Sequence, residues 1–309
     1  MPTGDSAIVF NNPSSGFALT SASLANLIDH IGKYFSVVDV IDRVGLPEAL
    51  QSLARLVDVG TTIFVLGGDG TIGVVANFLI EQDVDAAIAP IPTGTGNDFT
   101  SFVGISKDHN TAVRQLIDGS VHHIDCGMVE WSGPRGSGSH VFVNSFGIGY
   151  DARVAENVDR YKSLGSAGYV AAALHTLIGW NNQAGTVVVD DTAIEKTKFM
   201  FASVCNGRSS GGGFKLAPEA SLVDHQLDYF IMGDISRLMA LMLLPAIRLR
   251  GKWSSPKITS GRARKLLITF DDPHPIHLDG EIASPATSTV AVRCLPGALS
   301  MLLPDGAIT

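Results

Sequence analysis

The sequence predicts an α/β domain with a parallel sheet at the N-terminus, followed by a β-rich domain. Up to residue 124, short apolar runs alternate with helix-like stretches, which is typical of a parallel sheet with helices on both faces. Beyond it, the runs are mostly β-type and separated by Gly, Pro and Asp turns, which favours a β-sandwich. Three glycine- or hydroxyl-rich loops also follow strands of the first half. We therefore expect two domains, 1–124 and 125–309.

Each expected strand is a run of β-branched, aromatic or other apolar residues bounded by turn residues. In the first domain we expect strands at 6–10, 36–41, 62–66 and 86–91, and helices at 20–35, 46–58, 72–82 and 108–118. In the second we expect strands at 121–129, 140–146, 186–189, 198–205, 226–232, 265–270, 276–278 and 289–295, with helical stretches near 151–180 and 235–250.

A glycine-rich loop separates the run at 62–66 from the start of a helix. A strand, a tight turn and a helix start bring backbone N–H groups to one point, where the helix dipole favours an anion. Glycine lets a phosphate approach the backbone closely. Because the carboxylate of Asp69 in this loop would repel a phosphate, a Mg²⁺ ion between them is implied. The alternative is an ordinary Gly-Asp-Gly turn.

Two further loops repeat this pattern after the runs at 7–10 and 86–91. Ligands of open α/β sheets collect outside the carboxyl ends of the strands, so these loops should converge. The sequence therefore predicts a nucleotide site. The candidate nucleotide-binding residues are Asn12, Gly67, Gly68, Asp69, Gly70, Thr71, Gly94, Thr95 and Asn97.

Two carboxylates near the C-terminus are candidates for acid–base chemistry. Asp279 and Glu281 flank Gly280, and on a strand their side chains would point the same way. One could then accept a hydroxyl proton while the other holds that hydroxyl or a water molecule. The alternative is a surface hairpin turn. The sequence leaves open which of the two is the base.

The net charge of −8 hides an asymmetry along the chain. Residues 237–265 contain eight bases and no acid, whereas the rest holds 14 bases and 30 acids. A basic stretch interspersed with leucines could dock on an anionic membrane surface, with Arg248, Arg250 and Lys252 as candidate contacts. The alternative is a solvated surface. Nucleic-acid binding is disfavoured, because the acidic remainder would repel a polyanion.

Composition favours a cytoplasmic protein. The longest apolar stretch, 238–247, is about half the length that a membrane-spanning helix needs, so no transmembrane segment is expected. No basic residue precedes Lys33, which disfavours a signal peptide. Cys126, Cys205 and Cys294 are odd in number and far apart, which fits reduced thiols.

Taken together, the three loops resemble the diacylglycerol kinase catalytic domain family, which includes bacterial soluble lipid kinases and the sphingosine and ceramide kinases. The resemblance continues through 144–152, 211–218 and 278–281, so it covers nearly the whole chain. It implies a NAD kinase/phosphofructokinase-like first domain and a β-sandwich-type second domain. It also allows the extreme C-terminus to return to the first domain.

The resemblance further implies an ATP- and Mg²⁺-dependent kinase that phosphorylates the hydroxyl of diacylglycerol or a related lipid. The acceptor would be reached by peripheral association with the membrane, and a homodimer is left open. Asp279 and Glu281 fall where the family holds its proposed general base. Asp224 and the backbone carbonyls of Ser221 and Gln226 fall where it has a structural cation, although His225 replaces a common glycine.

One departure keeps two alternatives open. The family typically continues the first loop with Asn-Glu, whereas this chain has Gly73 and Val74. The lost carboxylate is the main support for a catalytically weakened, lipid-binding regulatory protein. A NAD kinase-like small-molecule kinase shares the Gly-Gly-Asp-Gly loop, but the loop over 93–98 favours the lipid kinases.

Overall fold

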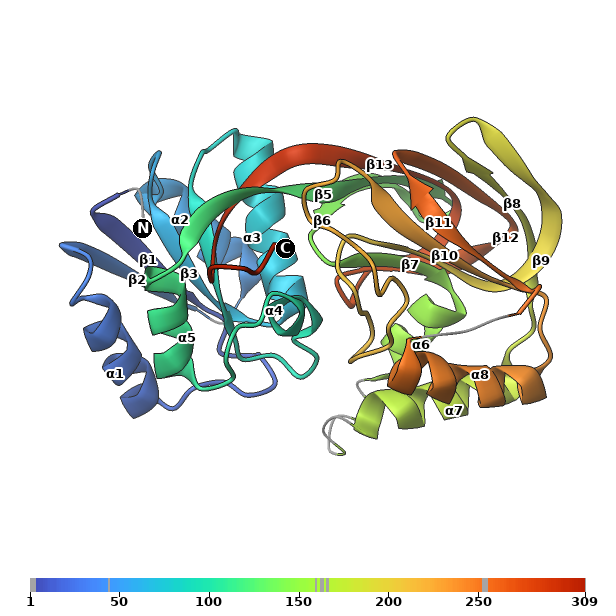
Figure 1. The fold of residues 1–309 in the computed structure, drawn as a ribbon, viewed down its shortest axis with the longest axis horizontal. Coiled ribbons are helices and arrows are strands. Elements are labelled where there is room, and N and C mark those ends of the chain that lie inside the picture. The colour runs from blue at the N-terminus through green and yellow to red at the C-terminus, as the bar shows by residue number, and fades with distance from the viewer. Residues whose placement is uncertain are drawn as a thin grey trace. The chain divides into compact units, whose positions relative to one another are not determined.

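The computed structural model describes residues 4–43, 45–158, 160–161, 164, 167–251 and 255–308, although not the side chains of 194–197 and 250. Two compact units divide the chain, and each has its own core (Figure 1). Unit 1 comprises Met1–Ile124 and Gly297–Thr309, and unit 2 comprises Asp125–Pro296.

Unit 1 is an α/β domain on a parallel sheet. Its strands lie in the order β4-β3-β1-β2, and the end of β13 joins β4 in parallel where Met301 pairs with Ile88. The elements are β1 (Ser6–Asn11), α1 (Ser21–Ile31), β2 (Val37–Asp42), α2 (Leu46–Leu56), β3 (Thr62–Gly67), α3 (Asp69–Gln82), β4 (Ala87–Pro92), α4 (Asp98–Phe102) and α5 (His109–Ile117).

The strands of unit 1 show why this sequence forms a parallel sheet. All six residues of β3 and all six of β4 are buried, as expected for central strands covered on both faces. Helix α3 packs against both strands, and α1 packs against α5. The α/β fold class expected for the first domain is confirmed.

Unit 2 is built from antiparallel strands around an aromatic core that includes Phe142, Phe146, Phe199 and Phe270. It is the β-sandwich-type domain that the sequence predicts. Its elements are the second part of β5 (Ser120–Gly133), β6 (Gly136–Phe142), β7 (Ser145–Gly149), α6 (Tyr150–Val158), α7 (Gly168–Gly179), β8 (Gln183–Val189), β9 (Thr192–Cys205), β10 (Leu227–Gly233), α8 (Arg237–Arg250), β11 (Ile258–Ala263), β12 (Lys265–Leu278) and the first part of β13 (Glu281–Leu303).

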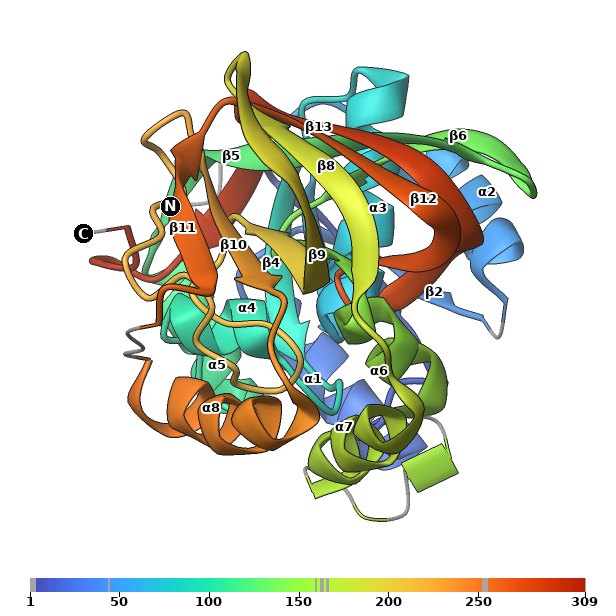
Figure 2. The ribbon, with the colours of Figure 1, turned by 90° about the vertical axis from the view of Figure 1, so that its right-hand side faces the viewer.

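Helices α6, α7 and α8 gather on one side of the strands of unit 2 (Figures 1 and 2). A second apolar cluster joins them to the sheet, through residues such as Tyr150, Phe201 and Phe230. Helix α8 begins at Ser236, whose side chain accepts a hydrogen bond from the N–H of Met239, and ends at Gly251 in a left-handed conformation.

Three expectations about element boundaries were wrong. The run at 140–146 is not one strand, because β6 ends at Phe142 and β7 begins at Ser145. The helical stretch near 151–180 contains two helices, α6 and α7, and the last strand is much longer than 289–295. The break at 143–144 has a clear cause, since the N–H groups there donate to the side chain of Asp279.

A buried histidine in the core of unit 2 has consequences for stability. The ring of His274 lies 4.8 Å from that of Phe270 and 5.9 Å from that of Trp180. Neither of its ring nitrogens has a hydrogen-bond partner among the described residues. Burial, with a smaller contribution from Arg153, lowers the pKa of His274 to about 4.

We expect unit 2 to lose stability in mild acid through this residue. Below pH about 6.5 His274 is protonated in the unfolded chain but stays neutral in the folded chain. The unfolding free energy therefore falls as the pH drops from about 6.5 towards 4. Between pH 7.5 and 5, wild type should lose about 1–2 kcal/mol more unfolding free energy than a His274→Phe variant. Urea unfolding at both pH values measures this difference, and equal losses would contradict it.

Candidate functional site

The three loops predicted to bind a nucleotide lie at one edge of the sheet of unit 1. In the parallel register Asn11 pairs with Leu66, and Gly67 pairs with Pro92. Strands β1, β3 and β4 therefore end side by side, and each loop begins at the same edge. This is the convergence that the sequence predicts.

Hydrogen bonds tie the three loops together. The amide of Asn12 donates to the hydroxyl of Thr71 at 2.9 Å, and the hydroxyls of Ser15 and Thr93 are 2.9 Å apart. The N–H of Phe17 donates to the carbonyl of Thr93 at 2.8 Å. The nine candidate nucleotide-binding residues thus belong to one connected group of loops.

Two glycines allow the second and third loops to touch. A Cβ atom on Gly94 would lie 2.4 Å from the Cα atom of Gly68, a distance that no side chain tolerates. The side chain of Asn97 closes its own loop, because it accepts from the N–H of Gly94 and donates to its carbonyl. The backbone of Asn97 is left-handed, with φ of 55°. Backbone groups are thereby exposed where a phosphate could approach.

Asp69 is the first residue of helix α3, and its carboxylate lies beside the start of α4. Its two oxygens accept the N–H groups of Asp98 and Phe99, each at 2.9 Å. Asp98 is 5% exposed. The sequence analysis did not select Asp98 as a site residue. It stands in the third loop beside Asn97, and an acid next to the glycines was the available signal.

The carboxylates of Asp69 and Asp98 both lie near Gly96. A Cβ atom placed on Gly96 would lie 3.5 Å from Oδ2 of Asp69 and 3.7 Å from Oδ2 of Asp98. Two carboxylates beside phosphate-type loops are the ligands that Mg²⁺ uses together with substrate phosphates. The donors therefore fit Mg²⁺, although no group of three or more His, Cys, Asp or Glu side chains is placed to hold a metal among the described residues.

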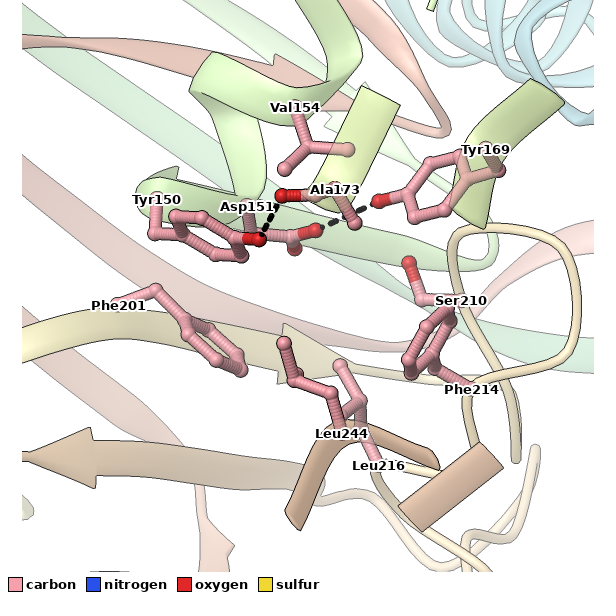
Figure 3. A pocket seen from close by; sticks show the side chains of 10 residues that line it. All are labelled: Tyr150, Asp151, Val154, Tyr169, Ala173, Phe201, Ser210, Phe214, Leu216 and Leu244. Carbon is pink, nitrogen blue, oxygen red and sulfur yellow. Dashed lines mark hydrogen bonds between the residues drawn. The ribbon is translucent and has the colours of Figure 1, made fainter. Parts of the chain in front are cut away.

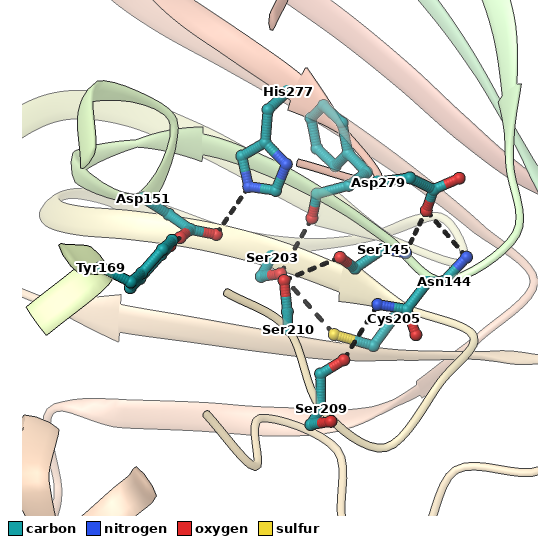
Figure 4. Close-up of polar contacts among 11 residues, drawn as sticks. Asn144, Ser145, Asp151, Tyr169, Ser203, Cys205, Ser209, Ser210, His277 and Asp279 are labelled. Atoms are coloured by element: carbon teal, nitrogen blue, oxygen red, sulfur yellow. Dashed lines mark hydrogen bonds and ion pairs between the residues drawn. The ribbon is translucent and has the colours of Figure 1, made fainter. Parts of the chain in front are cut away.

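In unit 2, Asp279 lies in the turn between β12 and β13, with φ of 51°. Its carboxylate accepts three backbone N–H groups, from Val143, Asn144 and Ser145, at 2.8–2.9 Å (Figure 4). Its own N–H donates to the carbonyl of Ser145 at 2.7 Å. Burial raises the pKa of Asp279 to about 6, and the three N–H donors oppose that rise.

The expectation that Asp279 and Glu281 point the same way from a strand was wrong. Asp279 and Gly280 both have positive φ and form the hairpin turn, while Leu278 and Glu281 pair across it. Asp279 is buried and bound to the backbone, whereas the side chain of Glu281 is exposed. Glu281 is therefore the more accessible of the two carboxylates, whereas Asp279 fixes the turn.

An apolar pocket opens in unit 2 between α6, α7, α8 and strand β9 (Figure 3). Its cavity volume is about 20 Å³, and the surrounding empty space, including the part open to solvent, is about 360 Å³. Its apolar walls come from side chains such as Phe201, Phe214 and Leu244. Its polar groups are Asp151, Tyr169 and Ser210, together with the hydroxyl of Tyr150.

Asp151 is the charged group of this pocket, and it is held from two sides. Its carboxylate lies 2.9 Å from Nε2 of His277 and accepts the hydroxyl of Tyr169 at 2.9 Å (Figure 4). Burial acts to raise the pKa of Asp151, but His277 and the two hydrogen bonds outweigh it and keep this pKa below its ordinary value. Sequence analysis selected neither Asp151 nor His277, because their proximity depends on tertiary structure.

The residues of the expected structural cation site lie in a loop before β10. Oδ2 of Asp224 is buried, has no hydrogen-bond partner among the described residues, and lies 3.6 Å from Nη1 of Arg262. His225 adopts the left-handed conformation, with φ of 62°, and its N–H donates to Asp125 at 2.6 Å. That oxygen lies in an ion pair with Arg262, and Ser221, Asp224 and Gln226 remain a proposed cation site.

The bases of the segment 237–265 mostly have partners within unit 2. Arg237 donates to the carbonyl of Trp180, and Arg248 donates to the carbonyl of Gly212 while lying over the ring of Phe214. Arg262 and Lys265 lie in ion pairs with aspartates. The side chain of Arg250 and the whole of Lys252 fall outside the described residues. No helix in the described parts of the chain is long and apolar enough to cross a membrane.

Two family models match the chain. The model of the diacylglycerol kinase catalytic domain matches residues 6–129, and that of the YegS C-terminal NAD kinase beta sandwich-like domain matches residues 144–303. The two matches contain the loops of unit 1 and the pocket of unit 2, respectively.

Relatives and solved structures agree with this assignment. A protein of Stenotrophomonas maltophilia named "Probable lipid kinase YegS-like" is 29% identical over 84% of this chain and 84% of its own length. A Staphylococcus haemolyticus protein named "Putative lipid kinase" is 29% identical over 79% of this chain and 77% of its own length.

Among solved structures, a "putative diacylglycerol kinase" from Bacillus anthracis str. Sterne has the same fold. It gives a TM-score of 0.79 at 20% identity, over 97% of this chain and 98% of its own. Yeast NADH kinase, solved with NADH, gives a TM-score of 0.54 at 11% identity, over 96% and 82% of the two chains. With both domain models matched in order, the chain belongs to the lipid kinase family that joins a diacylglycerol kinase catalytic domain to a YegS C-terminal domain.

Proposed function

We propose that this protein transfers the γ-phosphoryl group of ATP to the hydroxyl of diacylglycerol or a related lipid at a membrane surface, with Mg²⁺ as its metal. The observation that carries the proposal is the combination of two sites in one chain. Unit 1 presents glycine loops and two carboxylates, and unit 2 presents an apolar pocket with a buried acid. Incubation of the purified protein with Mg²⁺, labelled ATP and a panel of lipids tests it, and absence of any phosphorylated lipid would contradict it.

The loops of unit 1 support the nucleotide part of the proposal. Gly68 and Gly94 bring the backbones of two loops together, so main-chain N–H groups can bind phosphate oxygens. Asp69 and Asp98 would hold Mg²⁺, which when bound neutralises the charge of the phosphates. Val74 stands where the resemblance to the family implies a glutamate, but these two aspartates are present, and we therefore prefer an active kinase to a regulatory protein.

The pocket of unit 2 supports a lipid as the acceptor. Its apolar walls suit acyl chains, whereas a polar substrate such as NAD would find few hydrogen-bond partners on them. Asp151 supplies one buried acceptor that could hold the hydroxyl or another polar group of the lipid. His277 and Tyr169 fix the orientation of its carboxylate in advance of binding.

In the proposed reaction the acceptor oxygen attacks the γ-phosphorus, and the bond from that phosphorus to the bridging oxygen of ADP breaks. Glu281 accepts the proton that the acceptor hydroxyl loses. Asp279 is a positioning residue, because its bonds to Val143, Asn144 and Ser145 fix the turn that carries Glu281. Phosphoryl transfer depends mainly on positioning and charge neutralisation, so the loops of unit 1 should matter as much as the base.

Removing either proposed magnesium ligand should abolish most turnover. We expect Asp69→Asn and Asp98→Asn each to lower kcat at least about 100-fold, because the charge of the phosphates is no longer fully neutralised. Asp83→Asn, at the exposed far end of the same helix, is the matched control and should keep wild-type activity. Steady-state kinetics measures the effect, and near-normal rates in a folded Asp69→Asn protein would disprove the assignment.

Substitution of Glu281 should lower the rate of the reaction, whereas substitution of Asp279 should lower the stability of the fold. Glu281→Gln should lower kcat by about 10²–10⁴ with unchanged thermal stability and ATP affinity, since this exposed group acts as the base. Asp279→Asn should lower the unfolding free energy by about 1–3 kcal/mol, because buried N–H groups lose an acceptor. Glu130→Gln, an exposed glutamate elsewhere in unit 2, is the control. Loss of ATP affinity in Glu281→Gln, with kcat maintained, would reject Glu281 as the base.

Filling the pocket should affect long lipids most. Ala173 lines the pocket and is 6% exposed, so Ala173→Leu places three further carbons inside it. We expect the KM for a long-chain diacylglycerol to rise about tenfold, and the KM for ATP to stay unchanged. Ala171→Leu, on the same helix but outside the pocket, is the control. An equal KM for the lipid in both variants would place the acceptor elsewhere.

A further inference from the structure

The outward face of helix α8 is apolar. Among its described side chains, the exposed ones after Arg237 are Leu238, Leu241, Met242, Pro245 and Leu249. Leu238, Met242 and Leu249 are 67%, 63% and 75% exposed. A helix on a water-facing surface ordinarily turns its polar residues outward, so α8 has the opposite pattern.

Helix α7 repeats this pattern beside it. Val170, Leu174 and Ile178 recur every four residues on one face and are 37%, 47% and 73% exposed. The two helices pack against each other in unit 2 (Figures 1 and 2). Together they form an apolar ridge, defined here as Leu174, Ile178, Leu238, Leu241, Met242 and Leu249. Large exposed apolar patches on a protein mark interaction sites.

The same two helices also line the pocket on their inner sides. Ala173 of α7 and Leu244 of α8 face the cavity, while neighbouring residues of each helix form the ridge (Figure 3). The ridge and the pocket are therefore formed by different residues of the same two helices.

The charges around the ridge suit a phospholipid surface. Neither α7 nor α8 contains an acidic residue, whereas α8 contains Arg237, Arg248 and Arg250. Arg237 and Arg248 donate to neutral carbonyl groups, so their charges are not cancelled by those bonds. A second copy of this chain would bring an equal positive charge to the same face, which disfavours self-association there.

We propose that the apolar ridge inserts into the acyl layer of a phospholipid bilayer and docks unit 2 on the membrane. The proposal rests on the lipid kinase function proposed above, for which it names the docking surface. It differs from docking through the bases alone, because the leucines, isoleucine and methionine of the ridge supply most of the affinity. The bases add attraction to anionic headgroups.

Sedimentation with sucrose-loaded vesicles tests the ridge. Vesicles of phosphatidylcholine, with and without phosphatidylglycerol, are mixed with the full-length protein in the absence of ATP. The test variant carries Ile178→Gln, Leu238→Gln, Met242→Gln and Leu249→Gln, four positions exposed enough that folding should not depend on them. We expect it to bind both kinds of vesicle at least about 100-fold more weakly than wild type.

A matched variant controls for the loss of exposed apolar surface. It carries Val37→Gln, Val40→Gln, Leu56→Gln and Val59→Gln, four exposed positions of unit 1, and should bind as wild type does. Raising the salt to 1 M should remove the preference for anionic vesicles but keep the binding that depends on the ridge. Equal binding by wild type and the ridge variant would overturn the proposal. So would a dimeric wild type that the ridge variant converts to monomers without loss of vesicle binding.

Turnover is measured separately with a short-chain, water-soluble diacylglycerol and no vesicles. The ridge variant should keep wild-type kcat there, because the ridge is outside the pocket. If the protein phosphorylates lipid but the ridge variant binds vesicles as wild type does, the docking proposal is wrong and the kinase assignment holds. Ridge-dependent vesicle binding without phosphorylation of any lipid supports docking and removes the kinase assignment.

Discussion

A buried carboxylate organises much of unit 2. Asp279 accepts N–H groups from three consecutive residues, 143–145, and so ends β6 and begins β7 at this point. The same residue makes the tight turn from β12 to β13, which sets the positions of His277 on one strand and Glu281 on the other. The orientation of Asp151 towards the pocket then follows from His277. Loss of the Asp279 carboxylate would therefore disturb several groups that never touch it.

The sequence was sufficient to predict the loops of unit 1 and to offer a hairpin turn at 279–281 as an alternative, but not the backbone partners of Asp279 in unit 2. Glycine loops after buried strands converge because parallel strands end at one edge, a rule that needs only local patterns. The partners of Asp279 lie about 135 positions earlier, and no periodicity reports such a contact. Asp98 was not predicted as a site residue for a similar reason, because only the fold places its carboxylate on the same side of Gly96 as that of Asp69.

Helices α7 and α8 show a second limit of sequence patterns. Both are apolar nearly all round, so periodicity could not indicate which face is buried. The sequence predicted the basic residues of the segment 237–265 as the membrane contact. In the structure, several of them form hydrogen bonds or ion pairs within unit 2. Exposed apolar side chains became visible only once the buried face of each helix was known.

The close contact between Gly68 and Gly94 limits which residues of the loops can be substituted, whereas the lining of the pocket has no such limit. A site built from main-chain groups offers natural selection few side chains to exchange, and at Gly94 any side chain would push the loops apart. The pocket of unit 2, by contrast, is lined by ordinary side chains whose size and polarity can drift one substitution at a time. Diversification of acceptors among relatives should therefore be recorded in the pocket, while the phosphate-type loops stay nearly constant.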